Sequence, residues 1–363
     1  MSKDVRPQRI AIVNCYLARR EDQCERNEFP RNHLWGGDYL ARMGAKVQYI
    51  YPRRDLLLRL TRKIANMAKG RLGYLDFDVE MLRRAREFDV IYAPYGRFLL
   101  CQLAAALGLL KAPIVYWVYS PPHKSTSLNL DEIWWKWPFN RGIGGILCLT
   151  SAAAEGFQKK WPKLKVAHVE WTPDNILFPG SEVEGEFYFA CGRTNRDYKT
   201  LVAAAAKLDV QFVIVASPSL MEGLPIPPNV RFVEGPPSTA SDRGGVPFPE
   251  LISYYANAKA LCIPLQDIPA DTSGYTNVLE AMAMYRPILM TQTGTLDLDI
   301  EKEGLGRWVE PDSADSWVAA IQEMEAQPEL RKQMRERAKT MIDDTYNLDR
   351  HGKEVADFLS SLT

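Results

Sequence analysis

Short runs of β-branched and aromatic residues alternate with amphipathic helical patterns along the whole chain of 363 residues. This alternation is typical of α/β folds, in which helices connect the parallel strands of a sheet. The strands expected from it are Arg9–Asn14, Lys46–Tyr51, Val90–Ala93, Ile114–Tyr119, Gly145–Leu149, Val166–Val169, Phe187–Ala190, Phe212–Ala216, Val230–Val233, Ala260–Pro264 and Pro287–Thr291. The helices expected between them are Leu34–Met43, Leu56–Lys69, Phe98–Leu109, Ser151–Trp161, Lys199–Leu208, Phe248–Asn257, Thr276–Met284, Ser313–Ala326 and a region from Pro328 onward.

One stretch interrupts the alternation and divides the chain in two. Residues 171–186 (WTPDNILFPGSEVEGE) are rich in proline and acidic residues, which is the composition of an interdomain linker. We therefore expect two doubly wound parallel-sheet domains in tandem, covering residues 1–175 and 176–345. Ligands bind such sheets beyond the carboxyl ends of the strands, so two domains that face each other would form a central cleft.

The 45 basic and 45 acidic residues cancel, but they are unevenly distributed. Residues 1–170 carry 28 Lys and Arg against 16 Asp and Glu, which leaves 17 against 29 for residues 171–363, or net charges of +12 and −12. Halves of opposite sign suggest domains with different partners. Nucleic acid is not expected as a partner, because the acidic half would repel it and no recognition motif is present.

The six cysteines are isolated in the sequence, without a C-x-x-C pair or a histidine cluster that would complete a zinc site. We expect them to be reduced thiols in the cytosol. The N-terminal sequence MSKDVRPQRI lacks the apolar core of a signal peptide, and no apolar stretch approaches the ~18 residues of a membrane span. The expected location is the cytoplasm, either in solution or on the inner face of a membrane.

Common nucleotide-binding signatures are missing from the sequence. Gly142, Gly144 and Gly145 do not follow an expected strand, as a dinucleotide-binding fingerprint requires. The segment 192–200 (GRTNRDYKT) ends in Lys-Thr, but Tyr198 stands where a P-loop needs glycine. Rossmann-type dehydrogenases and P-loop enzymes are therefore disfavoured.

Two junctions between a strand and a helix in the second half carry groups suited to anions. At the first, residues 191–200, Arg193 follows the end of a strand, and Lys199 lies at the start of the next helix. Two cations beside the free N–H groups of a helix start are suited to hold a diphosphate. The alternative interpretation is a pair of solvated surface cations.

The second junction is DTSGYTNVLEAM, residues 271–282. Gly274 permits close approach of the backbone, and a Ser273 or Thr276 cap on the following helix would leave amides for phosphate oxygens. Glu280 lies four residues after Thr276 on the same helical face, where a carboxylate can accept both hydroxyls of a ribose. The alternative is an ordinary helical glutamate.

Together the two junctions resemble the nucleotide-sugar domain of the GT-B glycosyltransferases, in particular the retaining group called glycosyltransferase family four. The resemblance rests on G-R-x(5)-K at 192–199, on Pro264, and on SGYTNVLEAMAMYRPIL at 273–289. The first half matches only in the order of its elements and in a terminal helix, Leu348–Leu362. The resemblance implies an α/β GT-B fold with two Rossmann-like domains, in which residues 346–363 cross back onto the first domain.

For the chemistry, the resemblance implies a hexosyltransferase of polysaccharide or glycolipid biosynthesis, which moves a sugar from a nucleotide-diphosphate-sugar to an acceptor hydroxyl with retention. The nucleotide-sugar is a substrate, and neither a cofactor nor a metal is expected. Arg193 and Lys199 would neutralise the diphosphate, and Glu280 would bind the ribose. The donor sugar and phosphate would be contacted by Ser273, Gly274, Tyr275 and Thr276.

The sequence departs from the family at two positions. Thr272 stands where the family usually has a sugar-contacting glutamate, so either Asp271 replaces it with an offset of one residue, or the contacts come from the backbone and Asn277. Tyr119 stands where the family often has a histidine, and His123 follows four residues later. The candidate catalytic residues are Arg193, Lys199, Asp271 and His123.

Two features of the first half bear on the acceptor. The segment HLWGGD at 33–38 places Gly36 and Gly37 at an expected helix start. In GT-B enzymes a loop at this place borders the donor diphosphate and the acceptor. The alternative is a turn that binds no ligand. Residues 53–71 carry seven basic residues against Asp55, with apolar residues at helical spacing. Such a basic amphipathic helix binds anionic lipid, which favours a lipid-linked saccharide or glycolipid acceptor, or else it packs with its arginines in solvent.

Two other functions remain open at this point. A GT-B sugar-nucleotide epimerase would need an additional acid and base within reach of the sugar. A non-catalytic interaction subunit would account for the missing glutamate, but it has no physical need for Arg193, Lys199 and Glu280 together.

Overall fold

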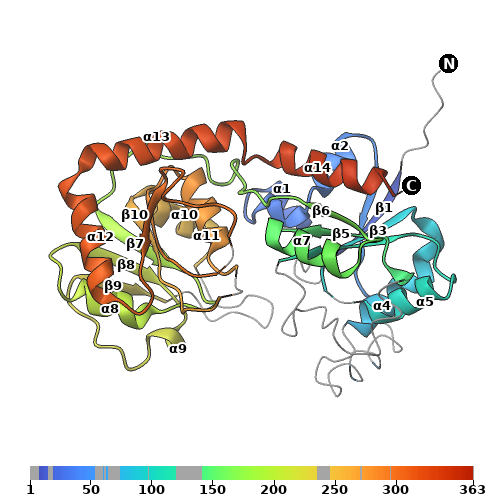
Figure 1. Ribbon diagram of the computed structural model, residues 1–363, viewed down its shortest axis with the longest axis horizontal. Helices are drawn as coiled ribbons and strands as arrows, with labels where there is room; N and C mark the ends of the chain where they lie inside the picture. The colour runs from blue at the N-terminus through green and yellow to red at the C-terminus, as the bar shows by residue number, and fades with distance from the viewer. Residues whose placement is uncertain are drawn as a thin grey trace. The chain divides into compact units, whose positions relative to one another are not determined.

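The computed structural model describes most of the chain, and the described part forms two compact units (Figure 1). The described residues are 8–14, 19–53, 60, 63, 74–96, 98–119, 141–234, 246–269, 272–294 and 296–362. The first unit consists of Met1–Asp22, Asn32–Trp171 and Leu348–Thr363, and the second consists of Gln23–Arg31 and Thr172–Asn347.

The second unit includes a short segment from the early part of the chain, which differs from the expected boundaries. This segment, Gln23–Arg31, belongs there because the Arg31 amide donates a hydrogen bond of 2.7 Å to the Asp174 carboxylate. In addition, the Phe29 ring packs edge-on against Phe248, with 5.5 Å between the ring centroids. The linker from Thr172 onward is also part of the second unit.

The first unit is built on six parallel strands in the order β2-β1-β3-β4-β5-β6. The strand order reverses direction between β1 and β3, which makes their carboxyl ends the topological switch point of this sheet. The strands are β1 (Arg9–Asn14), β2 (Lys46–Tyr49), β3 (Val90–Tyr95), β4 (Ile114–Val118), β5 (Gly145–Cys148) and β6 (Lys165–His168).

Helices cover both faces of this sheet. One face packs against α4, α5 and α7 through Met81, Cys101 and Phe157. On the other face α14 lies beside α2 (Figure 1). The helices of the described first part of the chain are α1 (Glu21–Glu25), η1 (Arg31–Leu34), α2 (Gly37–Arg42), α4 (Leu75–Arg84), η2 (Ala85–Glu87), α5 (Leu99–Ala106) and α7 (Ser151–Lys160), and α14 is Leu348–Ser360.

Glycines allow α2 and α14 to approach closely. A Cβ on Gly352 would lie 2.3 Å from the Cβ of Tyr39, and a Cβ on Gly36 would lie 3.2 Å from the Gly352 Cα. A Cβ on Gly37 would lie 2.2 Å from the Tyr49 hydroxyl oxygen. A side chain at any of the three positions would displace its neighbours, so the Gly-Gly pair at 36–37 takes part in the packing of the first unit.

The face under α14 is rich in aromatic side chains. Trp35 stacks on Trp171 with 5.1 Å between the ring centroids, and it meets Trp117 edge-on at 5.2 Å. His351 of α14 lies 5.4 Å from Trp117 and forms a hydrogen bond of 3.0 Å with the Glu170 carbonyl. Burial lowers the pKa of His351 to about 4, so the imidazole is neutral at physiological pH and joins the core.

The second unit is built on six parallel strands in the order β12-β11-β10-β7-β8-β9. The chain fills the sheet from β7 toward β9 and then from β10 toward β12, so β7 and β10 flank the switch point. The strands are β7 (Phe187–Cys191), β8 (Gln211–Val215), β9 (Val230–Val233), β10 (Ala258–Ile263), β11 (Ile288–Thr291) and β12 (Gly306–Val309).

Helices also cover both faces of the second sheet. One face packs against α8 and α12 through Leu201, Trp317 and Ile321. The other face packs against α10 and α11, and α13 lies against α11 and α12 (Figure 1). The helices are α8 (Tyr198–Ala205), α9 (Pro218–Met221), α10 (Phe248–Ala256), α11 (Tyr275–Ala283), α12 (Ala314–Ala326) and α13 (Pro328–Asp344).

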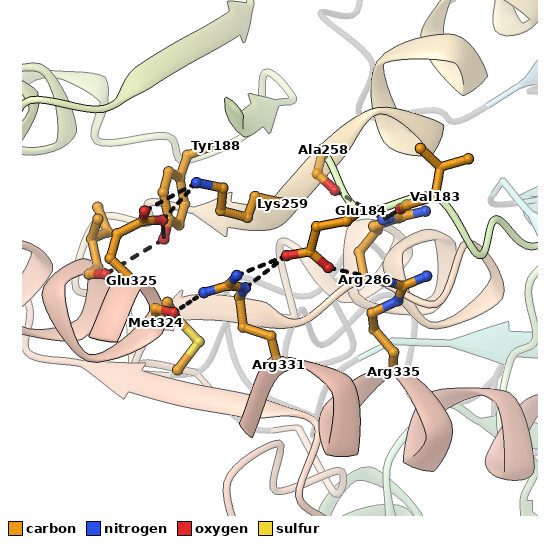
Figure 2. A network of polar contacts seen from close by, with 11 residues as sticks. Val183, Glu184, Tyr188, Ala258, Lys259, Arg286, Met324, Glu325, Arg331 and Arg335 are labelled. Atoms are coloured by element: carbon orange, nitrogen blue, oxygen red, sulfur yellow. Dashed lines mark hydrogen bonds and ion pairs between the residues drawn. The ribbon is translucent and has the colours of Figure 1, made fainter. Parts of the chain in front are cut away.

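A polar network binds the linker to the amino end of this sheet (Figure 2). Arg331 of α13 donates to the linker residue Glu184 through Nε at 3.0 Å and Nη2 at 2.8 Å. Nearby, Glu325 accepts from the Tyr188 hydroxyl at 2.7 Å and from Lys259 Nζ at 2.9 Å. The first set of contacts ties α13 to the linker, and the second ties α12 to β7 and β10.

Arg286 is the most buried charged residue of this network, with 1% of its surface exposed. Its guanidinium donates to the carbonyl oxygens of Ser181 and Val183, both at 2.7 Å, and to that of Ala258 at 3.0 Å. Burial lowers the pKa of Arg286 to about 10, so the group remains charged at neutral pH. It connects two linker carbonyls to the first residue of β10.

The predicted fold class, two doubly wound parallel-sheet domains of the GT-B type, is confirmed. Strand β12 and helix α4 were not predicted. The helical region expected from Pro328 onward forms α13 and α14, and α14 corresponds to the terminal helix predicted at Leu348–Leu362. Most of the helix predicted at Leu56–Lys69 lies outside the described residues. None of the helices in the described ranges is both long and apolar enough to span a bilayer.

Candidate functional site

The candidate site lies in the second unit, where β7 and β10 end. In open α/β sheets ligands bind at the carboxyl ends of the strands that flank the switch point. Residues 192–197 follow β7 and lead into α8, and residues 264–274 follow β10 and lead into α11. The two junctions singled out in the sequence are therefore on neighbouring strands.

Backbone hydrogen bonds fasten these two loops together. The Asp197 amide donates to the Pro264 carbonyl at 3.1 Å, and the Gln266 amide donates to the Asn195 carbonyl at 3.0 Å. The Asn195 side chain also donates to the Ser273 hydroxyl at 3.2 Å. The loops thus form one connected surface, although their residues are about 70 positions apart in the sequence.

The two predicted phosphate-binding cations, Arg193 and Lys199, are both exposed. Arg193 follows Gly192 in the loop after β7, and Lys199 is in the first turn of α8. The N-cap of α8 is Asp197, whose carboxylate accepts from the Thr200 amide at 3.1 Å. Lys199 in this helix start and Arg193 in the loop before it are accessible from solvent, a position suited to cations that hold a diphosphate.

A third cation of the same loop, Arg196, is buried, and sequence reasoning did not single it out. Its guanidinium donates to the carbonyl oxygens of Thr194 at 2.7 Å and Cys191 at 3.3 Å, and to the Asn277 side-chain oxygen. Gly192 makes room for it, because a Cβ there would lie 2.3 Å from a guanidinium nitrogen. Arg196 therefore connects the end of β7 to the first turn of α11.

Glu280 lies in a buried polar network on the α10 and α11 face of the sheet. It accepts from the Tyr255 hydroxyl at 2.5 Å and from the Asn277 amide nitrogen at 3.3 Å, both on Oε2. The Asn277 nitrogen also donates to the Tyr255 hydroxyl at 3.0 Å and to the Cys191 sulfur at 3.2 Å. The amide of Asn277, predicted as a contact for the donor, is thus used within the protein.

Burial raises the pKa of Glu280 to about 7, and hydrogen bonds from Tyr255 and Asn277 and the charge of Arg196 partly oppose this rise. The folded protein therefore holds this proton more tightly than the unfolded chain, whose glutamate has a pKa of 4.5. It follows that the contribution of Glu280 to stability decreases as the pH rises from 4.5 toward 7. A ligand that donates hydroxyl groups to the carboxylate would offset this cost.

The start of α11 differs from the expected capping arrangement. Gly274 is the N-cap with φ +87°, and no side chain caps it, whereas Ser273 accepts from Asn195. A Cβ on Gly274 would lie 2.9 Å from a methyl carbon of Ile263, so both backbone angle and space favour glycine. Tyr275 is buried, and Thr276 is partly exposed beside the helix start.

The remaining predicted site residues are Gly36, Gly37, Asp271 and His123. Gly36 and Gly37 belong to the first unit and have the packing functions described above. Asp271 and His123 lie outside the described residues. Among the described residues no group of three or more His, Cys, Asp and Glu side chains is arranged to hold a metal ion.

Comparison with known protein families finds a match in the same region. Residues 243–341, which contain β10, α11 and Glu280, match one family model. The family is Glycosyl transferases, group 1. The segment shared with group 1 includes the second of the two junctions but not the first. No curated protein matches the chain in sequence.

Solved structures resemble the chain over nearly its whole length. A glycosyltransferase from Rickettsia africae is 14% identical with a TM-score of 0.63, and the match covers 98% of each chain. Sucrose-phosphate synthase from Thermosynechococcus elongatus is 16% identical with a TM-score of 0.62, covering 98% of this chain and 99% of that one. HepE from Anabaena, solved with UDP-glucose, is 12% identical with a TM-score of 0.61, covering 98% and 100%. These likenesses show the GT-B fold, whose second domain here contains the segment that matches the group 1 model.

Proposed function

We propose that the protein is a glycosyltransferase that moves a hexose from a nucleotide-diphosphate-sugar to an acceptor hydroxyl with retention of configuration. The observation that carries this proposal is the joining of two loops at the switch point of the second sheet. One loop supplies exposed cations, and the other supplies an uncapped helix start followed by Glu280. The group 1 match and the Anabaena structure with UDP-glucose support a nucleotide-sugar as the donor.

Each of these groups has a defined task in the proposed donor complex. Arg193 and Lys199 neutralise the diphosphate together with the amides at the start of α11. Glu280 accepts hydrogen bonds from the ribose hydroxyls. Ser273, Gly274 and the residues that follow it contact the donor sugar and phosphate through the loop.

The proposed reaction is a front-face displacement. The acceptor hydroxyl oxygen forms a bond to the anomeric carbon as the bond from that carbon to the phosphate oxygen breaks, and the nucleoside diphosphate leaves with the electron pair. A phosphate oxygen of the donor takes the proton of the acceptor hydroxyl. Arg193, Lys199 and the helix start stabilise the leaving group, so we propose that no metal is required.

Replacement of Lys199 by alanine tests the donor site. We expect nucleoside diphosphate binding to weaken at least about tenfold, because one charge-assisted hydrogen bond is lost, while binding of the nucleoside is unchanged. The measurement is a thermal shift and titration series with uridine, guanosine and thymidine diphosphates, followed by hydrolysis assays with the matching nucleotide-sugars.

The matched control for this substitution is Lys207→Ala. Lys207 is an exposed lysine just beyond the other end of α8 and pairs with Asp315 at 2.7 Å. The Lys207→Ala variant should bind the diphosphates with the same affinity as the unmodified protein. Equal losses for nucleoside and nucleoside diphosphate in Lys199→Ala would refute its phosphate role, and no stabilisation by any nucleotide would refute the proposed donor site.

We further propose an anionic lipid-linked saccharide or a glycolipid as the acceptor. The support is the charge of the basic segment, Arg53–Arg71, in a first half of net charge +12. Most of this segment lies outside the described residues. Its first member, Arg53, donates to the buried carboxylate of Glu80 at 3.1 Å and is thus engaged within the protein.

Vesicle binding tests the acceptor side. The protein is expected to sediment at low salt with vesicles that contain phosphatidylserine, because each basic residue near an anionic surface contributes about 1 kcal/mol. Neutralising Arg59, Arg62 and Lys63 with glutamine should release it. The control neutralises three exposed lysines near α7 instead, Lys159, Lys160 and Lys163. Equal binding by both triple variants would argue against the segment as the lipid contact.

A further inference from the structure

We propose that Tyr255 is a positioning residue that holds the Glu280 carboxylate fixed and charged for the ribose diol, and that nucleotide affinity therefore depends on pH in the neutral range. Neither the sequence motifs nor the group 1 match assigns a role to Tyr255. The inference deepens the proposed function and rests on it, because it assumes that Glu280 receives the ribose of a nucleotide.

The Tyr255 hydroxyl has two neighbours to which it can donate, the Glu280 carboxylate at 2.5 Å and the Cys191 sulfur at 3.3 Å. Its oxygen accepts a hydrogen bond of 3.0 Å from the Asn277 amide nitrogen and lies 2.5 Å from Glu280 Oε2. The carboxylate is closer than the sulfur and is the stronger acceptor, so the hydroxyl donates to Glu280, and the Cys191 thiol can in turn donate to the hydroxyl. The ring is fixed by edge-on contacts with Phe178 at 5.9 Å and Phe189 at 5.1 Å between centroids.

Among the titratable groups that the structure describes around Glu280, the carboxylate is the one that changes charge near neutral pH. Tyr255 faces it from α10, Cys191 from the end of β7, and Arg196 from the loop after β7. Burial raises the pKa of Cys191 to about 12 and that of Tyr255 well above its usual value, so both stay neutral. The pKa of Glu280 is raised to about 7 by burial.

The charged carboxylate is the form that a ribose diol needs. An ionised carboxylate offers only acceptor sites, whereas a protonated one uses an oxygen as a donor. Nucleotide affinity should therefore fall as the pH drops below about 7, by roughly tenfold for each pH unit. The Tyr255 hydrogen bond favours the charged form, so it extends the binding range toward lower pH.

The test is the pH profile of donor affinity in Tyr255→Phe. The probe is whichever of UDP-glucose, GDP-mannose and dTDP-glucose binds in the thermal shift series, because the phosphates of these nucleotide-sugars do not take up a proton near neutral pH. We expect the midpoint of the profile to move up by about one pH unit or more, because a hydrogen bond to the charged form is lost. Affinity at pH 6 should fall about tenfold, while affinity at pH 9 stays within about twofold.

The neighbouring tyrosine provides a matched control. Tyr254→Phe removes the same hydroxyl one residue earlier on α10, where it donates to Glu250 at 3.2 Å outside the network. Its profile should equal that of the unmodified protein. Identical profiles for Tyr255→Phe and Tyr254→Phe would overturn the inference, because a merely structural tyrosine would change affinity equally at every pH.

A second variant keeps the inference testable if Tyr255→Phe does not fold. Glu280→Gln removes the titrating group, so its donor affinity should be weak and independent of pH between 6 and 9, to within about twofold. A pH dependence that persists in Glu280→Gln would overturn the inference while leaving nucleotide binding established. Failure of all three nucleotide-sugars to bind the unmodified protein would overturn the proposed function itself, and this inference with it.

Discussion

Arg196→Met is expected to destabilise the second unit by about 3 kcal/mol and to weaken nucleotide binding about a hundredfold. The substitution keeps most of the side-chain volume but removes every donor of the guanidinium. Three acceptors would lose their partner in a buried environment: the carbonyls of Thr194 and Cys191 and the side-chain oxygen of Asn277. Because Asn277 also donates to Glu280 and Tyr255, the loss would extend to the proposed ribose contact.

The measurement is the thermal midpoint of the unit together with a nucleotide titration at a temperature where it is folded. A decrease of about 3 kcal/mol in the free energy of unfolding corresponds to a decrease in Tm of roughly 6–12 °C. The matched control is Arg193→Met on the same loop, where the side chain is exposed. It should weaken diphosphate binding but change the unfolding free energy by less than about 0.5 kcal/mol. If both variants lost the same stability, the assignment of Arg196 as the structural cation would be wrong.

Arg286→Met is expected to have a still larger effect on stability, about 4 kcal/mol, with no effect on nucleotide binding in the folded protein. Its guanidinium donates to three carbonyl oxygens, those of Ser181, Val183 and Ala258, and it is almost completely buried. Methionine would leave these carbonyls without the donor. The contacts lie at the amino end of β10, whereas the candidate site lies at the carboxyl end.

Thermal unfolding and nucleotide titration separate the two arginines. Arg286→Met should lower Tm by roughly 8–16 °C and leave the dissociation constant within about twofold. The control is Lys339→Met. Lys339 also pairs with the linker, through Glu182 at 2.9 Å, but its side chain is 43% exposed to solvent. An exposed pair of this kind contributes about 0–1 kcal/mol. If folded Arg286→Met no longer bound nucleotide, the contacts at the amino end of the sheet would not be independent of the site at the carboxyl end. That result would contradict the prediction.

The alternation of strand and helix patterns predicted the fold class, because most strands of these sheets are apolar on both sides and stand out in the sequence. Helix α4 was missed because its buried side includes Asp76, Asp78 and Glu80, which disguise an amphipathic pattern. Strand β12 was missed because GRWV is short and lies at the edge of its sheet. These failures arise where tertiary contacts override the local pattern.

For the site, the sequence predicted the two junctions but not the residues that connect them. Arg193, Arg196 and Lys199 look alike in the sequence, and only the contact of Arg196 with Asn277 makes it the buried one. The same holds for the Tyr254 and Tyr255 pair, since one hydroxyl meets Glu250 near the surface and the other meets Glu280 in the interior. Contacts between residues so distant in the chain leave no local pattern.

The position of α14 in the first unit has a consequence for folding during synthesis. The sheet of that unit is complete once β6 has been made, but α14 is translated roughly 10–40 s later, at a rate of ~5–20 residues per second. Until then the aromatic side chains around Trp35 and Trp117 lack α14, whose His351 packs against Trp117. The second unit needs nothing after Asn347, so it is completed first. The first sheet is therefore synthesised first, but the core of the first unit is completed last. In the meantime the aromatic face of the first sheet is the surface to which a chaperone would bind.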